Sequence, residues 1–220
     1  MSRALIIGAS GGIGQALTAQ LRAQGHSVAG LSRSADGLDI TSEQSVIDCL
    51  ARVDGPFDKI IVATGGLEIG PHAPEKTLKA LDPDAFAAQF ALNATGPALI
   101  LKHAMQFLPR DRQSVFAVLS ARVGSIEDNR LGGWYSYRAS KAALNQIVRT
   151  AAIEVARSHP LAICVALHPG TVATAFTRNY QNHPAVSPGD AALNLVSVIG
   201  ALSPADTGRF FDWSGAPVAW

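Results

Sequence analysis

The stretch Ala4-Leu5-Ile6-Ile7-Gly8-Ala9-Ser10-Gly11-Gly12-Ile13-Gly14 decides the fold of this chain. Its leading apolar residues predict a buried strand, and the apolar spacing over Ile13–Gln24 predicts a helix immediately afterwards. Glycines between these elements permit a tight turn and a close approach of the backbone to a bound group. Because free N–H groups point outward at the start of a helix, the turn favours an anion such as a pyrophosphate. The stretch therefore predicts a strand, a ligand-binding turn and a helix, in that order.

Apolar runs alternate with longer amphipathic stretches along the rest of the chain, which is typical of repeated strand-helix-strand units. Because the strands are apolar throughout, we expect an α/β fold with a doubly wound parallel sheet covered by helices on both faces. The predicted strands are Ala4–Ile7, Val28–Leu31, Lys59–Ala63, Ser114–Leu119, Ala162–Leu167 and Gly208–Phe211. The predicted helices are Ile13–Gln24, Ser42–Leu50, Pro83–Leu108, Tyr137–Ser158 and Ser187–Leu202. No repeat or Gly/Ser linker divides the chain, so we expect one domain over residues 1–220.

Composition and charge exclude several classes of function. The chain has 220 residues, with 18 Lys and Arg against 17 Asp and Glu, and a formal net charge of +1. Proteins that bind nucleic acid or anionic membranes normally carry a basic excess, so we expect neither partner. No apolar stretch reaches the ~18 residues of a membrane span, and the run before Gly8 lacks the flanks of a secretory signal. With Cys49 and Cys164 interpreted as buried thiols, we expect a cytoplasmic protein.

The segment Tyr137-Arg138-Ala139-Ser140-Lys141 begins the longest predicted helix after the centre of the chain. Its first and last residues are four apart, so they share one face of the helix. A tyrosine has a pKa near ~10, and a lysine ammonium close by would stabilise the phenolate and lower that pKa. Such a pair could move protons at neutral pH. Taken alone, such a pair is more often a packed ring beside a solvated charge.

Three irregular segments follow strands or lie beside strand ends: Gly65–Leu81, Gly124–Trp134 and Thr171–Val186. In an open parallel sheet, ligands bind at the carboxyl edge of the strands, so we expect the three segments to surround one site. Their large apolar side chains suggest an apolar substrate pocket. These side chains are Leu67, Leu131, Trp134, Phe176 and Tyr180.

Five motifs in sequence order resemble the short-chain dehydrogenase/reductase family. They are Gly8-x-x-x-Gly12-x-Gly14, Asn93 on a helix, Ser120 at a strand end, Tyr137-x-x-x-Lys141, and Pro169-Gly170-x-Val172-x-Thr174. The resemblance covers essentially the whole chain and implies a single-domain Rossmann-type fold and an NAD(P)-dependent oxidoreductase. Softer patterns, including Gly124-Ser125-Ile126 and the closing Phe211–Trp220, look like the subgroup of C-factor-type signalling proteins and sniffer-type carbonyl reductases.

The resemblance implies roles for four residues in hydride transfer between a nicotinamide and a small carbonyl or alcohol. Tyr137 would be the general acid, or the base in reverse, and Lys141 would bond the nicotinamide ribose and lower the tyrosine pKa. Ser120 would hydrogen-bond the substrate oxygen, and Asn93 would hold a water that relays protons from Lys141. The simpler alternatives are a loop-capping hydroxyl for Ser120 and a local backbone contact for Asn93.

The residues after the second predicted strand indicate the type of nicotinamide cofactor. Leu31-Ser32-Arg33-Ser34 contains no carboxylate before Asp36, and an arginine there can pair with a 2′-phosphate. We therefore expect NADP(H), bound by Arg33 and the flanking hydroxyls of Ser32 and Ser34, with NAD(H) possible and a solvated Arg33 as the alternative. The resemblance also implies that Asp39 and Ile40 contact the adenine. The other cofactor residues that it implies are Gly8, Ser10, Gly11, Gly12, Ile13, Gly14, Ala63, Thr64, Gly65, Asn93, Tyr137, Lys141, Pro169, Gly170, Val172 and Thr174.

The sequence departs from the family pattern at three places. Ile7 precedes Gly8 where the family usually has threonine. The segment Val62-Ala63-Thr64-Gly65 keeps the glycine of the family's Asn-Asn-Ala-Gly turn but loses the asparagine that normally braces it. No second serine neighbours Ser120, because Leu119 and Ala121 flank it. None of these changes removes a reacting group, so we still expect activity.

Two other functions fit parts of the sequence. Gly8-Ala9-Ser10-Gly11-Gly12 also satisfies the G-x-S-x-G pattern of a serine hydrolase with Ser10 as nucleophile. That pattern would follow the very first strand, so no earlier strand and loop could supply the second oxyanion donor. A C-factor-like signalling or regulatory protein on the same fold would need the cofactor pocket but little turnover.

Self-association and metal binding can also be assessed from the sequence. Family members often associate through the helix that carries the Tyr-Lys pair, which makes a homodimer or homotetramer possible. Ala143, Leu144 and Ile147 on that helix would suit such an interface or would face the sheet. No His or Cys spacing supports a metal site, and His168 is interpreted as a loop-packing residue.

Overall fold

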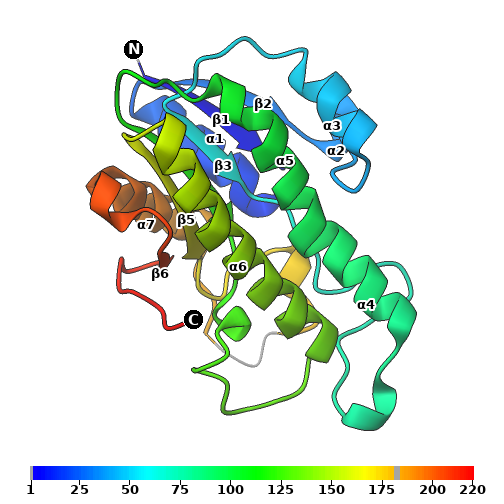
Figure 1. Ribbon diagram of the computed structural model, residues 1–220. Helices are drawn as coiled ribbons and strands as arrows, with labels where there is room; N and C mark the ends of the chain where they lie inside the picture. The colour runs from blue at the N-terminus through cyan, green and yellow to red at the C-terminus, as the bar shows by residue number, and fades with distance from the viewer. Residues whose placement is uncertain (1, 181–183) are drawn as a thin grey trace.

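Six parallel strands form one sheet in the order β2-β1-β3-β4-β5-β6 (Figure 1). The structure is a computed structural model that describes residues 2–180 and 184–220. The strands are β1 (Arg3–Ile7), β2 (Ser27–Leu31), β3 (Lys59–Val62), β4 (Ser114–Leu119), β5 (Ala162–His168) and β6 (Phe210–Asp212). Each lies where the sequence predicts a strand. The last begins after Gly208, whose φ of +75° lies in the left-handed region rather than the strand region.

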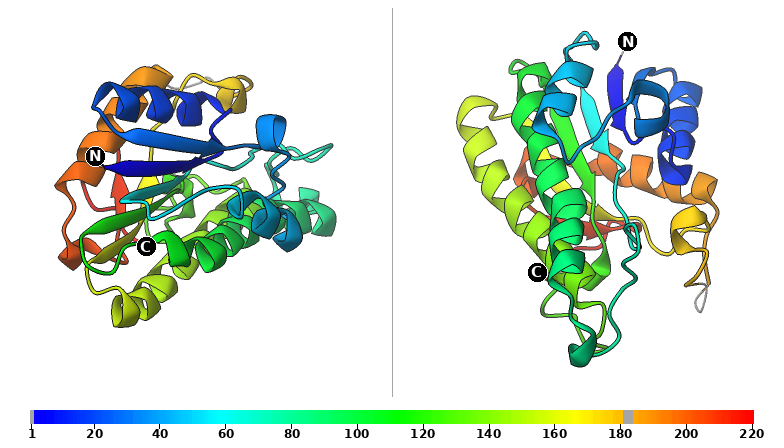
Figure 2. Two further views of the ribbon diagram at one scale, coloured as in Figure 1. Left: turned by 90° about the horizontal axis from the view of Figure 1, so that it is seen from above. Right: turned by 90° about the vertical axis from the view of Figure 1, so that its right-hand side faces the viewer.

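Helices cover both faces of the sheet, as the apolar strands predict (Figure 2). One face carries α1 (Gly12–Ala23) and α7 (Pro188–Ala201), and the other carries α3 (Glu43–Leu50), α5 (Gly96–Ala104) and α6 (Tyr135–Ser158). Side chains of β1 alternate between the two cores, because Leu5 and Ile7 face α5 and α6 while Ala4 and Ile6 face α1 and α7. Both cysteines are free and buried. No helix in the described part of the chain is long and apolar enough to cross a membrane.

The remaining elements are short. They are α2 (Arg33–Asp36), α4 (Pro83–Phe90), the π-helix η2 (Ala91–Thr95), and the 3₁₀-helices η1 (Leu78–Ala80), η3 (Met105–Phe107), η4 (Arg122–Gly124), η5 (Ala175–Thr177) and η6 (Pro204–Asp206). Ser187 caps α7 as predicted, since its hydroxyl accepts from the Asp190 N–H at 3.1 Å.

The prediction of one continuous helix over Pro83–Leu108 is wrong in detail. The segment is divided into α4, η2, α5 and η3, with the π-helical turn directly before Gly96 and Pro97. Pro97 has no N–H to donate to the carbonyl of Asn93 four residues earlier, so an unbroken α-helical ladder cannot form there. Asn93 therefore lies at an irregular turn rather than in a regular helix.

The chain changes direction across the sheet between β1 and β3. From β1 it runs outward to the edge strand β2, and it then returns to the other side of β1 to form β3. A crevice opens at such a switch point, at the carboxyl ends of the strands. The predicted segments 65–81, 124–134 and 171–186 border this edge, although residues 181–183 of the last one lie outside the described residues.

Candidate active site

Two cavities adjoin each other along the carboxyl edge of the sheet. The first, called the Tyr137 cavity, measures about 200 Å³, and the second, called the Arg33 cavity, measures about 270 Å³. Both are lined by the same four residues at their junction, which are Gly11, Ala63, Thr64 and Gly65. The two cavities therefore form a single elongated trough that suits a long, two-part ligand.

The glycine turn forms the floor of this trough. Gly8 has a φ of +88°, and a Cβ there would lie 2.9 Å from the Ala63 carbonyl oxygen. A Cβ on Gly14 would lie 2.1 Å from the Gly8 carbonyl oxygen, so α1 approaches the turn too closely for any side chain. Gly11 caps α1 without a side-chain hydrogen bond, and no acidic residue lies in the first turn. The N-terminus of α1 thus points toward the junction of the cavities and favours an anion.

Tyr137 and Lys141 are both buried on the first turns of α6 and line the Tyr137 cavity. The Lys141 Nζ donates a hydrogen bond to the Leu119 carbonyl oxygen at 3.0 Å and lies 6.0 Å from the centre of the Tyr137 ring. Burial lowers the pKa of Lys141 to about 8. Burial also raises the pKa of Tyr137 well above its usual value, which is the opposite of the predicted direction. Tyr137 is therefore a neutral O–H donor at neutral pH.

Ser120 follows β4 and lines the Tyr137 cavity. Its hydroxyl donates to Asn145 Oδ1 at 2.7 Å, and Asn145 Nδ2 donates to the Gly124 carbonyl oxygen at 3.4 Å. Asn145 thus orients the hydroxyl, and Ser120 must redirect its proton before it can donate to a substrate oxygen. Asn145 was not predicted as a site residue, although Tyr137, Lys141 and Asn145 are spaced four residues apart on one helix face.

Asn93 lies behind the Tyr137 cavity, on η2. Its Nδ2 donates to the Gly66 carbonyl oxygen at 2.8 Å, and its Oδ1 accepts from the Gly66 N–H at 3.0 Å. A Cβ on Gly65 would lie 2.9 Å from Asn93 Oδ1 and 3.5 Å from Lys141 Nζ, so both side chains flank this glycine. Asn93 therefore braces the turn after β3, where the family's own bracing asparagine is missing from Val62-Ala63-Thr64-Gly65.

Glu75 holds the start of α6 and was not found from the sequence. It is 5% exposed, its carboxylate accepts from the Ser136 N–H at 3.1 Å, and its carbonyl oxygen accepts from the Trp134 N–H. Trp134, the residue before the helix, has a φ of 54°, and its indole ring has no acceptor with which to cap the helix. Because Glu75 and Ser136 are 61 residues apart, no local sequence signal could indicate this contact.

The predicted apolar pocket is only partly present. Of its five residues, Phe176 alone lines the Tyr137 cavity, while Leu67 is buried and Leu131 is 88% exposed. Trp134 packs edge-on against Tyr137 and Tyr180, with ring centroids 6.2 and 5.4 Å apart, and the Tyr180 hydroxyl donates to the Glu68 carboxylate at 2.7 Å. These two rings anchor the surrounding segments instead of lining the cavity.

The Arg33 cavity is apolar on one side and charged on the other. Leu38, Ile40 and Leu92 form the apolar side, and Arg33 and Asp39 lie at the exposed side. Thr41 hydrogen-bonds the Asp39 carboxylate through its hydroxyl and its N–H, which lowers the pKa of Asp39, and the nearby Arg33 lowers it further. Leu38 and Leu92 were not predicted as site residues.

The trough brings together nearly all the residues predicted for the cofactor. The Tyr137 cavity contains Gly11, Gly12, Ile13, Ala63, Thr64, Gly65, Ser120, Tyr137, Lys141, Pro169, Gly170, Val172 and Thr174. The Arg33 cavity contains Gly8, Ser10, Gly11, Ser32, Arg33, Ser34, Asp39, Ile40, Ala63, Thr64 and Gly65. Gly14 and Asn93 are the two predicted residues that lie behind the lining.

The hydrolase alternative finds no catalytic arrangement around Ser10. Ser10 is exposed and lines the Arg33 cavity, whereas His168, the one histidine lining either cavity in the described part of the chain, lines the other. Burial lowers the pKa of His168 to about 4, so its ring is neutral, and Nδ1 is buried without a partner among the described residues. A nucleophilic serine needs a base within hydrogen-bond reach, and the described residues provide none here.

Comparison with known sequences agrees with the geometry. The family model for short chain dehydrogenase matches residues 37–185. The chain is 30% identical to a 1-hydroxy-2-glutathionyl-2-methyl-3-butene dehydrogenase from Rhodococcus sp. (strain AD45), covering 100% of both chains. It is 38% identical to the C-signal protein of Myxococcus xanthus over 61% of this chain and 78% of that one.

Solved structures show the same fold. A short-chain dehydrogenase/reductase from Burkholderia multivorans with bound NADP superposes with a TM-score of 0.81 at 25% identity, covering 100% of this chain and 99% of that one. The carbonyl reductase Sniffer of D. melanogaster superposes with a TM-score of 0.82 at 21% identity, covering 100% of both. Together with the family match over most of the sequence, these likenesses show that the chain belongs to the short-chain dehydrogenase/reductase family of oxidoreductases.

Proposed function

We propose that this chain reduces a carbonyl compound, or oxidises the corresponding alcohol, with NADP(H) as cofactor. The observation that carries the proposal is the shared burial of Tyr137 and Lys141 in a cavity that continues into the Arg33 cavity. A proton donor and a cation thus lie at one end of a trough, and a guanidinium lies at the other. The cofactor, when bound, supplies or accepts the hydride.

The trough fits a dinucleotide with a phosphate-bearing centre. At the junction, the Thr64 hydroxyl is buried without a partner among the described residues, so it offers a free donor. The N-terminus of α1 reaches the same junction without a capping side chain. Leu38, Ile40 and Leu92 form an apolar slot for a flat base beyond it. Several family members have been solved with NADP or NADPH bound, which supports this choice of cofactor.

Tyr137 is suited to protonate the substrate oxygen. As that oxygen gains negative charge, the Tyr137 O–H would donate its proton, and the Lys141 ammonium would stabilise the resulting phenolate. Ser120 would donate a second hydrogen bond after its hydroxyl turns away from Asn145. We place Asn93 behind Lys141. Because Pro97 has no N–H, the main-chain carbonyl of Asn93 lacks the usual helical donor, and a water that relays protons could bind there.

The neutral hydroxyl of Tyr137 suits the reduction direction at neutral pH. A tyrosine buried in its neutral form is ready to give a proton, whereas oxidation of an alcohol needs the phenolate. We therefore expect reduction to be fast near pH 7 and oxidation to rise with pH. The relative from Rhodococcus is named as a dehydrogenase, so both directions should be assayed.

The test compares wild type with Tyr137→Phe, using NADPH and a panel of aldehydes, ketones and quinones. We expect the variant to lose on the order of a thousandfold or more in rate, because it removes only the proton donor. Tyr135→Phe is the matched control, since Tyr135 lies on the same helix but lines neither cavity. Equal rates for wild type and Tyr137→Phe would contradict the assigned proton donor.

Cofactor preference rests on Arg33. Arg33→Ala should weaken NADPH binding by about tenfold and leave NADH binding nearly unchanged, because only NADPH carries the 2′-phosphate. Titration of intrinsic fluorescence gives both dissociation constants without turnover. A lower dissociation constant for NADH than for NADPH in the wild type would contradict the NADP(H) assignment.

A signalling role on the same fold is the second candidate. The observation in its favour is the 38% identity to C-signal of Myxococcus xanthus. A signalling role predicts that the protein binds NADPH yet consumes none across the substrate panel. Measurable consumption that Tyr137→Phe abolishes would decide for the enzyme.

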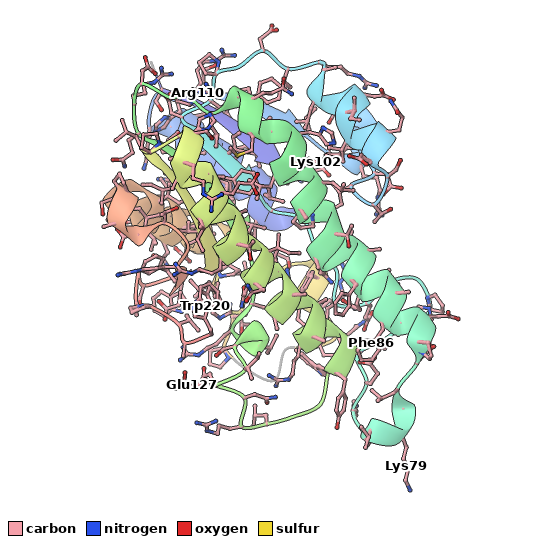
Figure 3. All side chains as sticks on the ribbon, in the orientation of Figure 1. Lys79, Phe86, Lys102, Arg110, Glu127 and Trp220 are labelled. Atoms are coloured by element: carbon pink, nitrogen blue, oxygen red, sulfur yellow. The ribbon has the colours of Figure 1, made fainter. Side chains whose placement is uncertain are left out.

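We also propose that residues 1–220 act as one domain that self-associates through α5 and α6. A groove between these helices is lined by Lys102 and Arg110, labelled in Figure 3, and by Ile147. Leu144, by contrast, is fully buried on the sheet, so it takes no part in an interface. Sedimentation of wild type and Ile147→Glu tests the proposal. A homodimer or homotetramer should dissociate in the variant, and a monomeric wild type would exclude the interface.

A further inference from the structure

We infer that Glu75 is a positioning residue for the proposed proton donor and acts through the first turn of α6. The inference rests on the proposed function, in which the Tyr137 hydroxyl protonates the substrate oxygen. Glu75 lines neither cavity, so it touches neither substrate nor cofactor. Its influence on the reaction passes through the main chain on either side of Tyr135.

The start of α6 is a strained segment. The chain enters the helix through Gly132, Gly133 and Trp134, whose φ values are 63°, 67° and 54°. Within the described ranges, Trp134 is the one residue other than glycine with a positive φ. A bulky side chain is unfavourable in this left-handed region, and such a conformation persists only where surrounding contacts enforce it. The first turn of α6 therefore needs support from another part of the chain.

Glu75 supplies that support with two acceptors. Its carboxylate Oε2 accepts from the Ser136 N–H at 3.1 Å, and its main-chain carbonyl oxygen accepts from the Trp134 N–H. Glu75 and Ser136 are 5% and 1% exposed, so without the carboxylate the Ser136 N–H would be buried and unpaired. The other carboxylate oxygen, Oε1, is buried and has no partner among the described residues. The side-chain support thus depends on a single acceptor oxygen.

The two residues held by Glu75 determine where Tyr137 lies. Ser136 directly precedes Tyr137, and the Trp134 ring packs edge-on against the Tyr137 ring, with centroids 6.2 Å apart. Ser120 follows β4, so it does not move with α6. A shift of the first turn therefore moves the Tyr137 hydroxyl away from the place where Ser120 meets the substrate oxygen. A misplacement of about 1 Å can cost about a hundredfold in rate.

Glu75→Ala and Glu75→Gln test this inference, because the first removes the side-chain acceptor and the second restores it as an amide oxygen. In Glu75→Ala, kcat for carbonyl reduction should fall roughly ten- to a hundredfold, while the dissociation constant of NADPH changes by less than about twofold. Glu75→Gln should stay within about threefold of the wild-type kcat, because its amide oxygen can accept from the Ser136 N–H.

The solvent deuterium isotope effect on kcat separates positioning from a general loss of structure. It should rise in Glu75→Ala, because proton transfer from a displaced Tyr137 becomes a larger part of the barrier. A smaller folded fraction would lower the rate and leave the isotope effect unchanged. Should Glu75→Ala fail to fold, Glu75→Asp carries the test. Its carboxylate keeps the charge but ends one methylene short, so kcat should still fall about tenfold.

Ser187→Ala is the matched control. It removes the hydroxyl that accepts from the Asp190 N–H at the start of α7, and Ser187 lines neither cavity. Ser187→Ala and Glu75→Ala should both lower Tm by about 2–8 °C, because each leaves a helix start without its cap. Ser187→Ala should nevertheless keep the kcat and the isotope effect of the wild type.

Three results would overturn the inference: a wild-type kcat in Glu75→Ala, or in Glu75→Asp where it replaces that variant; equal losses of kcat in Glu75→Gln and Glu75→Ala; or an equal loss in Ser187→Ala. The proposed function would still stand in each case if the wild type reduces a carbonyl and Tyr137→Phe abolishes that activity. A wild type without turnover across the substrate panel would overturn the proposed function and the inference together.

Discussion

The Tyr137 cavity and the Arg33 cavity share four lining residues, yet they differ in how their charged groups are held. Tyr137 and Lys141 are buried, and burial shifts both of their pKa values strongly. Arg33 and Asp39 are exposed, so solvent screens their charges. The difference teaches that the proposed proton donor depends on desolvation, whereas the proposed 2′-phosphate site depends on exposed charges.

The helices that carry these side chains also differ, in length and packing. Tyr137 and Lys141 stand on α6, a helix of 24 residues that packs along the sheet, while Arg33 and Asp36 belong to α2, which has only 4. A long packed helix fixes side chains more firmly than a single short turn. Substitutions should therefore have large effects in the Tyr137 cavity and smaller, charge-dependent effects in the Arg33 cavity.

After Tyr137→Phe, the largest effect is expected from Lys141→Met. The variant keeps a long apolar stem but loses the cation beside Tyr137, so the rate of carbonyl reduction should fall on the order of a hundredfold or more. At the same time its free energy of unfolding at pH 7 should rise on the order of 1–3 kcal/mol, because a buried ammonium is costly. Steady-state assays and urea unfolding measure the two changes. Lower stability at pH 7 would contradict the lowered pKa.

The pH dependence of that stability gain has a definite sign. The pKa of Lys141 is about 8 in the folded chain against 10.5 in the unfolded chain, so the unfolded chain binds more protons between these values. The stability of the wild type therefore gains from rising pH in this window, and the cost of burial is fully present below pH 8. The advantage of Lys141→Met over wild type should shrink when unfolding is measured at pH 9.5 instead of pH 7.

Gly14→Ala tests the turn that both cavities share. Its Cβ would lie 2.1 Å from the Gly8 carbonyl oxygen, so α1 must move away from the turn. We expect a loss of about 3 kcal/mol in the free energy of unfolding and weaker binding of NADPH and NADH alike. Gly200→Ala on α7 is the control, because nothing lies within 4 Å of that position, and it should gain up to about 1 kcal/mol. Selective loss of one cofactor in Gly14→Ala would contradict a shared turn.

Asn145→Leu tests the orientation of Ser120. Without the acceptor at 2.7 Å, the Ser120 hydroxyl becomes free to rotate, and kcat should fall about tenfold while KM changes little. Asn145→Asp, which retains an acceptor for Ser120, should recover most of the rate. An increase of kcat in Asn145→Leu would instead show that Asn145 competes with the substrate for the hydroxyl proton.

The smallest expected effect is that of salt on the two ends of the trough. Raising the ionic strength from about 0.05 to 0.5 M should weaken NADPH binding by a factor of about two to five, because exposed charges are screened. The value of kcat should change by less than about twofold, since Tyr137 and Lys141 are buried. Parallel titrations and saturating assays give both numbers. Equal salt sensitivity of the two would remove the distinction between the cavities.

Local sequence patterns predicted the strands, the glycine turn and the placement of Tyr137 and Lys141, because each depends on residues near one another in the chain. The contact between Glu75 and Ser136 and the pairing of Asn93 with Gly66 depend on distant segments, so no local pattern indicates them. The direction of the Tyr137 pKa shift was missed because it is set by burial, which the sequence does not quantify. The division of the helix at residues 91–95 could have been anticipated from Pro97.

The contact of Glu75 with the start of α6 also matters when the segment 65–81 is exchanged between family members to change their substrate preference. The segment 65–81 supplies Glu75, whose carboxylate and carbonyl oxygen accept from the N–H groups of Ser136 and Trp134, the residues on either side of Tyr135. A chimera that receives this segment from another family member without a glutamate at position 75 would lose a support of the helix that carries Tyr137. Transplants that end before Pro74 should therefore keep their turnover, whereas longer ones should need the glutamate to be restored.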